Sequence, residues 1–305
     1  MKLTTPLRTL PPPRMPVSQA RGFSLIELMV SMAILFVVVG TAVNYIGIAV
    51  QRSKGEQTKV DLAQEGREFV DEFERDIHQA GYPGCDFFNT LGSSNCATTA
   101  NYNKASLAMG LVSISYTNII FEGDVNGDGV VESVQYRLVD SNSNNPPASC
   151  PCTLQRSQVP KVAGLSAALS APAYRQATNW SQELQDIVNS GSPAGNAAYG
   201  GGVPISGNVL FGGGSISNTA YYAAVSSFKD FPVFSAYDQQ GLLVALPLDA
   251  TTPAGQHALT NIRSIRLTIN LLGSGLYGYD PKTGVRPVVT LVGDARRSNK
   301  MAWEP

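Results

Sequence analysis

The stretch RGFSLIELMVSMAILFVVVG, Arg21–Gly40, decides the fold, because it is almost wholly apolar and yet contains one acid, Glu27. Charged side chains are absent from residues 28–50, and these 23 residues are long enough to span a bilayer with some tilt. A lone carboxylate in hydrocarbon costs several kcal/mol, so Glu27 needs a partner there. The stretch therefore predicts a membrane-spanning helix in which the carboxylate of Glu27 pairs with a specific partner.

The residues before this stretch predict its orientation. Residues 1–22 carry four basic side chains and no acid, whereas the whole chain of 305 residues has a net charge of −1. A basic segment before an apolar run stays in the cytoplasm, and the rest of the chain crosses the membrane. A cleaved secretory signal has a shorter apolar core, of about 7–15 residues, followed by its small residues. Here Gly22 precedes the run, so a secretory signal and a plain uncleaved anchor are the weaker alternatives.

The residues RGFSLIELMVSMAIL closely resemble the N-terminal signal of type IV prepilins and of type II secretion pseudopilins. The resemblance rests on a basic leader ending in Arg21, on Gly22 before the cleavage point, on an aromatic residue after it and on Glu27 in the apolar helix. It implies that a prepilin peptidase cuts between Gly22 and Phe23 on the cytoplasmic side. The same enzyme would then N-methylate Phe23, so residues 1–22 are expected to be a cleaved leader.

Glu27 has two interpretations. Cleavage would create a new ammonium at Phe23, about one helical turn away, and N-methylation keeps that charge. In a bundle of parallel helices, this ammonium can meet Glu27 of a neighbouring subunit or of its own chain, which makes Glu27 an assembly contact. The alternative is that Glu27 extends to the cytoplasmic interface near the start of the helix. We favour the assembly contact, because the whole motif is present, and expect residues 23–50 to form a transmembrane and filament-core helix.

Residues 51–80 are expected to continue the helix into a head domain. They are rich in charge and repeat apolar residues at steps of three and four from Leu62 to Ala80, which predicts a helix with one buried stripe. The sequence AGYPG, residues 80–84, ends this helix. We expect the stripe to pack on a β-sheet.

Later stretches have the composition and alternation of β-strands. They are SLAMGLVSISYTNIIFEGD, GVVESVQYRLVD, TLQRSQV, AYYAAVSSF, PVFSAYDQQGLLVAL, NIRSIRLTINLL and VRPVVTLVGDA. Residues 160–220 are rich in Ala, Ser, Gly and Asn, and we expect a loop-rich insertion with little regular structure. The predicted fold class is α+β, with the long N-terminal helix packed on an antiparallel β-sheet in a head of residues 81–305.

The order of these pieces resembles PilW-type minor pilins and the J-type pseudopilins of type II secretion. The residues that carry this looser resemblance are HQAGYPGC, DVNGDGVVESVQYRL, LQR, FSAYDQQG and IRSIRLTINL. It implies other minor and major pilins, an inner-membrane assembly platform and membrane lipid as partners. It also implies an inner-membrane protein with its N-terminus in the cytoplasm and its head in the periplasm, later on the pilus at the cell surface. Asn44 stands where major pilins often carry proline, which favours a minor pilin or a pseudopilin.

The segment DVNGDGVVE is a candidate calcium loop. Asp124, Asn126 and Asp128 alternate as at the start of an EF-hand loop. The twelfth position is Gln135, which is not acidic, and Glu132 falls at the ninth. The alternative is a bare hairpin turn, in which the Asn-Gly and Asp-Gly pairs supply positive φ. Both interpretations stay open, with Ca²⁺ as the one cofactor that the sequence suggests.

The four cysteines are Cys85, Cys96, Cys150 and Cys152. A destination outside the cytoplasm permits disulfides, and four cysteines allow three connectivities. Cys85–Cys96 closes a short loop after the helix and is the first choice. A C-x-C bridge is strained, so pairing of Cys85 and Cys96 with Cys150 and Cys152 is an alternative.

Catalytic and nucleic-acid-binding functions find little support in the sequence. The chain has two histidines and lacks the G-x-S-x-G, H-E-x-x-H, P-loop and dinucleotide motifs. Its basic residues are mostly scattered among acids, so nucleic acid is not an expected partner. We predict a structural, non-enzymatic minor type IV pilin of PilW type that joins an initiating or tip complex. The alternatives are a J-type pseudopilin and a membrane-anchored binding module that never polymerises.

Overall fold

The computed structural model describes residues 22–84, 104–147, 152–162, 179–189, 231–273 and 288–299. The chain divides into two units, Met1–Ala49 and Val50–Pro305. The first unit contains the beginning of helix α1, whose bounds are Leu25–Gln79. Among the described residues, α1 is the one helix long and apolar enough to cross a membrane, with a mean hydropathy of 2.4 in its most apolar window.

The apolar side chains of the first unit are exposed on all sides of the helix. Leu25 is 77% exposed, Phe36 is 71% exposed and Tyr45 is 74% exposed. A helix that is apolar all round requires lipid or other helices around it. This surface supports anchoring of the chain by a single membrane pass.

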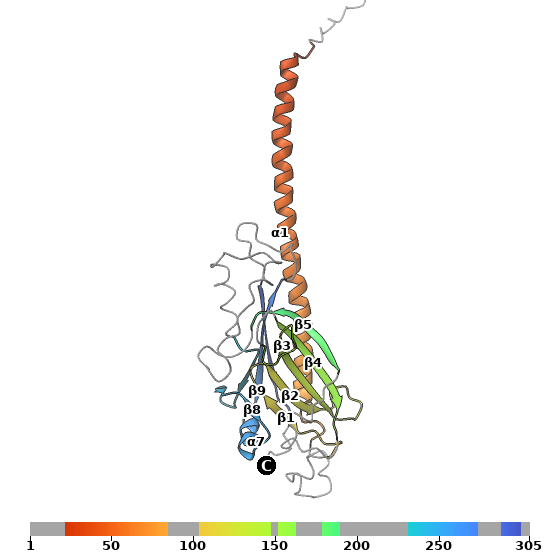
Figure 1. Ribbon diagram of the computed structural model, residues 1–305, viewed down its shortest axis with the longest axis vertical. Helices are drawn as coiled ribbons and strands as arrows, with labels where there is room; N and C mark the ends of the chain where they lie inside the picture. Colours follow the sequence, from red (N-terminus) through yellow and green to blue (C-terminus); the bar gives the residue numbers. More distant parts are fainter. Residues whose placement is uncertain are drawn as a thin grey trace, which may run out of the picture. The chain divides into compact units, whose positions relative to one another are not determined.

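The second unit contains a ten-stranded β-sheet in which every described strand pair is antiparallel. The strand order is β7-β6-β9-β5-β4-β3-β2-β1-β8, and β10 pairs with β9. Figure 1 labels strands β1 to β5, β8 and β9 of this sheet. A short helix, α7, Pro253–Thr260, follows β8. The predicted α+β class is therefore confirmed. The strands are β1 Gly110–Ile114, β2 Asn118–Gly123, β3 Glu132–Val139, β4 Cys152–Pro160, β5 Trp180–Ile187, β6 Phe234–Tyr237, β7 Leu243–Val244, β8 Leu248–Asp249, β9 Ser264–Leu272 and β10 Val288–Arg296.

Strand β5 corrects one expectation. It lies inside residues 160–220, where we expected loops, and it pairs with both β4 and β9. Its sequence, WSQELQDI, is mostly polar, and only Leu184 and Ile187 are buried. The strand is held by backbone pairing with its neighbours, which a local apolar pattern does not reveal. The predicted strand AYYAAVSSF and the rest of the expected insertion lie outside the described residues.

The C-terminal part of α1 packs on the sheet through the predicted apolar stripe. Phe69, Phe73 and Ile77 are at most 4% exposed. The ring centroids of Phe69 and Phe73 lie 5.7 and 5.5 Å from that of Tyr136 on β3, both in edge-to-face geometry. Since side chains alternate along a strand, Tyr136 shares this face with its buried neighbours Val134 and Leu138. The core of the head lies between α1 and this face.

Two glycines set how closely α1 approaches the sheet. A Cβ atom at Gly293 of β10 would lie 2.5 Å from Cγ1 of Val70. A Cβ atom at Gly66 of α1 would overlap Leu291 of β10. Glycine at both positions therefore lets helix and strand pack in direct contact.

Candidate functional site: the start of the helix and its anchor in the head

Glu27 binds the start of its own helix. The backbone N–H of Ser24 donates to Oε2 of Glu27 at 3.0 Å, and the N–H of Leu28 donates to the carbonyl of Ser24 at 3.2 Å. Ser24 is therefore the N-cap, and Glu27, the third helical residue, makes the returning bond of a capping box. The carboxylate also lies in the first turn, where the helix dipole favours negative charge. This contact was not predicted, although the S-x-x-E spacing of Ser24 and Glu27 signals it.

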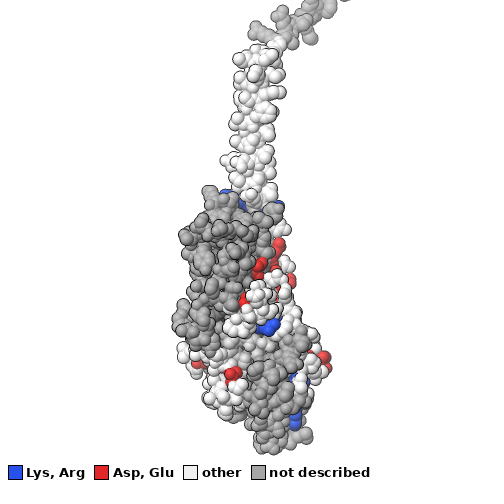
Figure 2. All heavy atoms as spheres, viewed as in Figure 1, with Lys and Arg blue, Asp and Glu red and all other residues white. Residues whose placement is uncertain are grey.

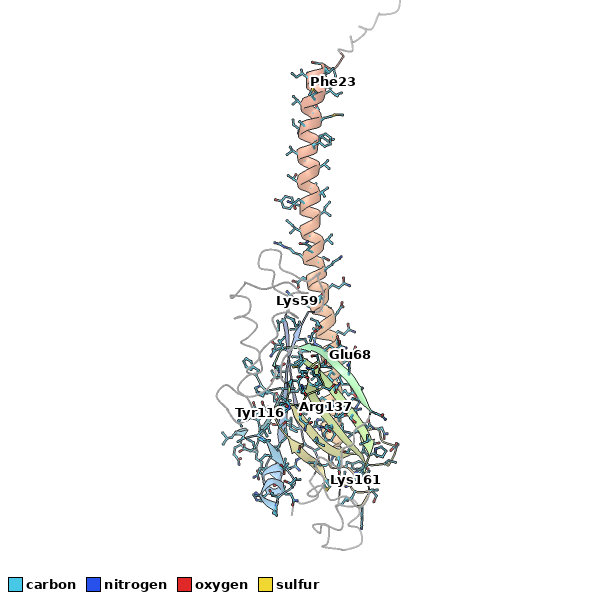
Figure 3. All side chains as sticks on the ribbon, in the orientation of Figure 1. Phe23, Lys59, Glu68, Tyr116, Arg137 and Lys161 are labelled. Carbon is cyan, nitrogen blue, oxygen red and sulfur yellow. The ribbon has the colours of Figure 1, made fainter. Side chains whose placement is uncertain are left out.

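The predicted cleavage point is accessible. Gly22 and Phe23 lie just before Ser24, the N-cap of α1, and Phe23, which Figure 3 labels, is 82% exposed. Glu27 is also exposed, so a donor from another chain can reach its carboxylate while the bond from Ser24 remains. Arg21 and the predicted leader lie outside the described residues, and cleavage and methylation stay predictions.

A buried ionic cluster fastens the last turns of α1 to the sheet. Oδ2 of Asp76 accepts hydrogen bonds from the Tyr136 hydroxyl at 2.7 Å and from Nη2 and Nε of Arg156 at 2.7 and 3.0 Å. The Asp76 side chain is 1% exposed and that of Arg156 is 13% exposed. Nε of Arg156 also lies 3.5 Å from Oε1 of Glu72, one turn earlier in α1. We call Asp76, Tyr136 and Arg156 the helix anchor, because they join α1, β3 and β4.

The protonation of the helix anchor follows from its burial. Burial raises the pKa of Tyr136 well above its ordinary value, and the Asp76 carboxylate raises it further. Tyr136 therefore stays neutral, and its hydroxyl donates a hydrogen bond to Asp76. Burial also raises the pKa of Glu72, although Arg156 acts in the opposite direction. Within the described part of the chain, Oδ1 of Asp76 is buried without a hydrogen-bond partner, so Asp76 depends on the contacts of its other oxygen.

A second buried ion pair lies elsewhere in the head. Nζ of Lys161 is 2.8 Å from Oε2 of Glu122, and both side chains are fully buried. Lys161 also donates to the carbonyl of Leu107 at 2.7 Å, and the N–H of Met109 donates to Glu122 at 3.1 Å. The pair therefore fastens the segment before β1 to β2 and to the end of β4. The sequence did not predict either buried cluster.

The candidate calcium residues lie in the turn between β2 and β3. Asp124 accepts hydrogen bonds from the N–H groups of Gly127, Asp128 and Gly129 at 2.7, 3.1 and 3.0 Å. Gly127 and Gly129 have φ of 77° and 84°, as expected for a hairpin turn with Asn-Gly and Asp-Gly. Asn126 donates to Oδ2 of Asp128 at 3.0 Å, whereas Asp124 contacts Asp128 through the backbone N–H of Asp128. The described residues contain no group of three or more His, Cys, Asp or Glu side chains placed to hold a metal, and calcium binding stays a prediction.

The cysteine pairing also stays a prediction. Cys152, the first residue of β4, is buried and disulfide-bonded. Cys85, Cys96 and Cys150 lie outside the described residues.

Comparison with known proteins gives one match. Residues 17–43 match the family model described as the prokaryotic N-terminal methylation motif. No curated protein and no solved structure matches the chain. The match includes Gly22, Phe23, Ser24 and Glu27, which are the residues at the start of α1.

Proposed function

We propose that this chain is a structural minor pilin of PilW type. Its N-terminal methylation motif supports a protein of the type IV prepilin and pseudopilin type. The observation that carries the proposal is the motif itself, followed directly by an exposed apolar helix. The protein would act in pilus assembly, within an initiating or tip complex. Its role is to pack against other subunits, because pilin-type proteins are generally structural.

Processing would begin at the accessible peptide bond between Gly22 and Phe23. A prepilin peptidase would hydrolyse this bond in the cytoplasm and N-methylate the new amino group of Phe23. The resulting ammonium is a fixed positive charge in the first turn of a helix, where the helix dipole disfavours it. Pairing with a carboxylate compensates this cost, and Glu27 is the acid within reach.

Assembly would use the remaining acceptor capacity of Glu27. A carboxylate has about four lone-pair sites, and the N–H of Ser24 takes one of them at 3.0 Å. The ammonium of a neighbouring subunit can therefore bind the same carboxylate without disturbing the cap. In hydrocarbon this pairing is strongly favoured over two separate charges. Other minor and major pilins supply such neighbours, and the inner-membrane assembly platform brings them together.

The mass of the N-terminal peptide tests the proposal. The full-length gene product is isolated from membranes of cells that have the peptidase, and its N-terminal peptide is identified by mass spectrometry. We expect a peptide that begins at N-methylated Phe23. An intact N-terminus at Met1 in such cells would overturn the proposal and leave a membrane-anchored module that does not polymerise.

A J-type pseudopilin of type II secretion shares the same motif. The two roles differ in phenotype, because loss of a minor pilin abolishes surface filaments, whereas loss of a pseudopilin abolishes secretion of exported enzymes. Deletion of the gene, followed by both assays, separates them. We expect loss of filaments with secretion intact.

A further inference from the structure

The side of the sheet that faces away from α1 carries polar side chains in register across four strands. Side chains alternate along a strand, so the neighbours of Tyr136 on β3 point away from the helix. Directly paired residues of antiparallel strands share a side of the sheet. Arg137 on β3 pairs with Asn118 on β2 and with Gln155 on β4, and Gln155 pairs in turn with Gln182 on β5. Together with two residues of the next row, these form what we call the polar face: Asn118, Gln135, Arg137, Gln155, Trp180 and Gln182.

The guanidinium group of Arg137 is held in one orientation on this face. Its Nε donates to Oε1 of Gln155 at 3.1 Å, and its Cζ lies 3.6 Å from the centroid of the Trp180 ring. A cation over an aromatic ring is attracted by it, and stacking fixes the plane of the guanidinium group. Figure 2 shows a small group of basic atoms at the surface of the head, beside uncharged ones, near the place where Figure 3 labels Arg137.

The charge of Arg137 has no compensating acid. Burial lowers the pKa of Arg137, and no neighbouring carboxylate acts in the opposite direction. The two terminal nitrogens of Arg137 donate no hydrogen bond within the described ranges of the chain. Arg156 and Arg266, by contrast, each bind an aspartate. A partly desolvated guanidinium group without a carboxylate is costly, and binding of an anion would offset that cost.

The amides around Arg137 offer donors to a ligand. Oδ1 of Asn118 accepts from Gln135 at 2.7 Å, and Oε1 of Gln182 accepts from Gln185 at 3.0 Å. Oε1 of Gln155 already accepts from Arg137. Each of these three amide oxygens therefore has a donor, and the NH₂ group beside it is left for another partner. Because the polar face also contains no acid, it complements a ligand rich in acceptor oxygens.

We propose that the polar face binds a carboxylated sugar, whose carboxylate takes two parallel hydrogen bonds from the terminal nitrogens of Arg137. A planar carboxylate matches the fork of a guanidinium group in this way. The remaining sugar oxygens accept from the neighbouring amide groups, and Gln182 at one end of the row is exposed. The row from Asn118 to Gln182 crosses three strand spacings, about 14 Å, which leaves room for more than one sugar ring. The head would thus have a ligand of its own, independent of processing at Phe23.

An acidic peptide fits this face less well than a sugar does. Acidic and phosphorylated peptide motifs are recognised by clusters of arginines, whereas the polar face contains one cation. A phosphate group carries a charge of about −1.5 to −2, which a single guanidinium group does not balance. Neutral amides complement hydroxyl groups, since both kinds of group can donate and accept. One carboxylate among many hydroxyls therefore matches one arginine among several amides.

Titration with trigalacturonate tests the proposal. The full-length protein is kept in detergent, because the first part of α1 is apolar and exposed. Binding is measured by isothermal titration calorimetry and by tryptophan fluorescence, which reports on Trp180. We expect saturable binding, and binding at least about tenfold weaker for trigalacturonate whose carboxyl groups are methyl esters. Absence of binding, or equal binding of the ester, would overturn the proposal. Tighter binding of an oligoglutamate peptide of the same charge would overturn it in favour of an acidic peptide.

Two variants test the role of Arg137. Arg137→Met removes the cation, and Arg266→Met is the matched control, because Arg266 is already paired with Asp294. In Gln155→Glu the new carboxylate still accepts from Nε of Arg137, but it also neutralises the guanidinium group. We expect both changes at the polar face to weaken binding about tenfold or more, and the control to bind like the unsubstituted protein. Thermal unfolding shows that each variant is folded, and Gln155→Glu preserves the test if Arg137→Met does not fold. Unchanged binding in a folded variant of the polar face would refute the proposal.

The same protein separates this inference from the proposed function. A processed N-terminus at Phe23 without sugar binding would overturn the sugar site and leave the minor-pilin proposal intact. Sugar binding by a protein with an intact N-terminus at Met1 would support the site and overturn the proposed function.

Discussion

Removal of Arg156 is expected to destabilise the head more than removal of an exposed arginine that makes a similar contact. In Arg156→Met, Asp76 keeps the Tyr136 hydroxyl at 2.7 Å but loses both guanidinium bonds, while its side chain remains 1% exposed. Breaking a buried ion pair from one side costs about 3–5 kcal/mol, because a charge is left without compensation. For a domain of this size, that corresponds to a fall in Tm of about 6–20 °C.

The matched control is Arg266→Met. Arg266 also binds an aspartate through two nitrogens, with Nε 2.8 Å from Oδ1 and Nη2 3.1 Å from Oδ2 of Asp294. The two side chains are 44% and 50% exposed, so solvent screens the pair and its loss should cost about 0–1 kcal/mol. Thermal unfolding of the full-length protein in detergent, followed by tryptophan fluorescence, compares the two variants. Equal shifts in Tm would refute the reasoning from burial.

A double variant separates the lost charge pair from lost packing. In Asp76→Asn/Arg156→Met the buried negative charge is gone, and the side-chain amide oxygen at residue 76 can still accept a hydrogen bond from the Tyr136 hydroxyl. We therefore expect a smaller loss of stability than in Arg156→Met alone, although the second variant changes one more residue. A double variant that is no more stable than the single one would contradict this account, because removal of the uncompensated charge would then bring no gain.

Three further changes test other contacts of the head by the same unfolding assay. Burial raises the pKa of Tyr136 above its unfolded value of about 10, so the contribution of Tyr136 to stability is present below that pH and is lost as the pH rises further. We therefore expect that Tm falls less steeply with rising alkaline pH in Tyr136→Phe than in the unsubstituted protein. Lys161→Met removes the cation beside the fully buried side chain of Glu122, so we expect a loss of about 3–5 kcal/mol, and a loss below 1 kcal/mol would contradict it. Gly293→Ala places a methyl group 2.5 Å from Val70 and should cost about 1–3 kcal/mol, whereas an unchanged Tm would mean that helix and strand separate freely.

The sequence predicts the elements of this fold better than the contacts between them. The resemblance to type IV prepilins and pseudopilins is confirmed by the match of residues 17–43. Helix α1 and strand β3 were predicted because their apolar residues repeat at steps of three to four and of two, which are local patterns. Strand β5 was missed because its polar sequence becomes a strand only by pairing with β4, more than twenty residues earlier.

The helix anchor shows why side-chain sites are harder to predict. Asp76 and Arg156 are 80 residues apart in the sequence, and each is an ordinary charged residue in its local context. Gly66 looks in the sequence like a weak point of the helix, yet the structure uses it for close contact with β10. Such roles depend on which element packs opposite, and a single sequence does not contain that information.

Glu27 combines two roles that one pair of substitutions can separate. Glutamine at the third helical position can still accept the N–H of Ser24, as glutamate does at 3.0 Å, but it carries no charge. Alanine removes both the cap and the charge.

If Glu27 acts in assembly by pairing with the ammonium of a neighbouring subunit, Glu27→Gln and Glu27→Ala should both be processed and both be lost from filaments. If it acts only by capping its own helix, Glu27→Gln should assemble like the wild type and only Glu27→Ala should fail. Processing is read from the N-terminal peptide and assembly from the amount of the chain in sheared filaments. We expect the first pattern, because a cap contributes about 0.5–2 kcal/mol, less than an unpaired charge costs in hydrocarbon.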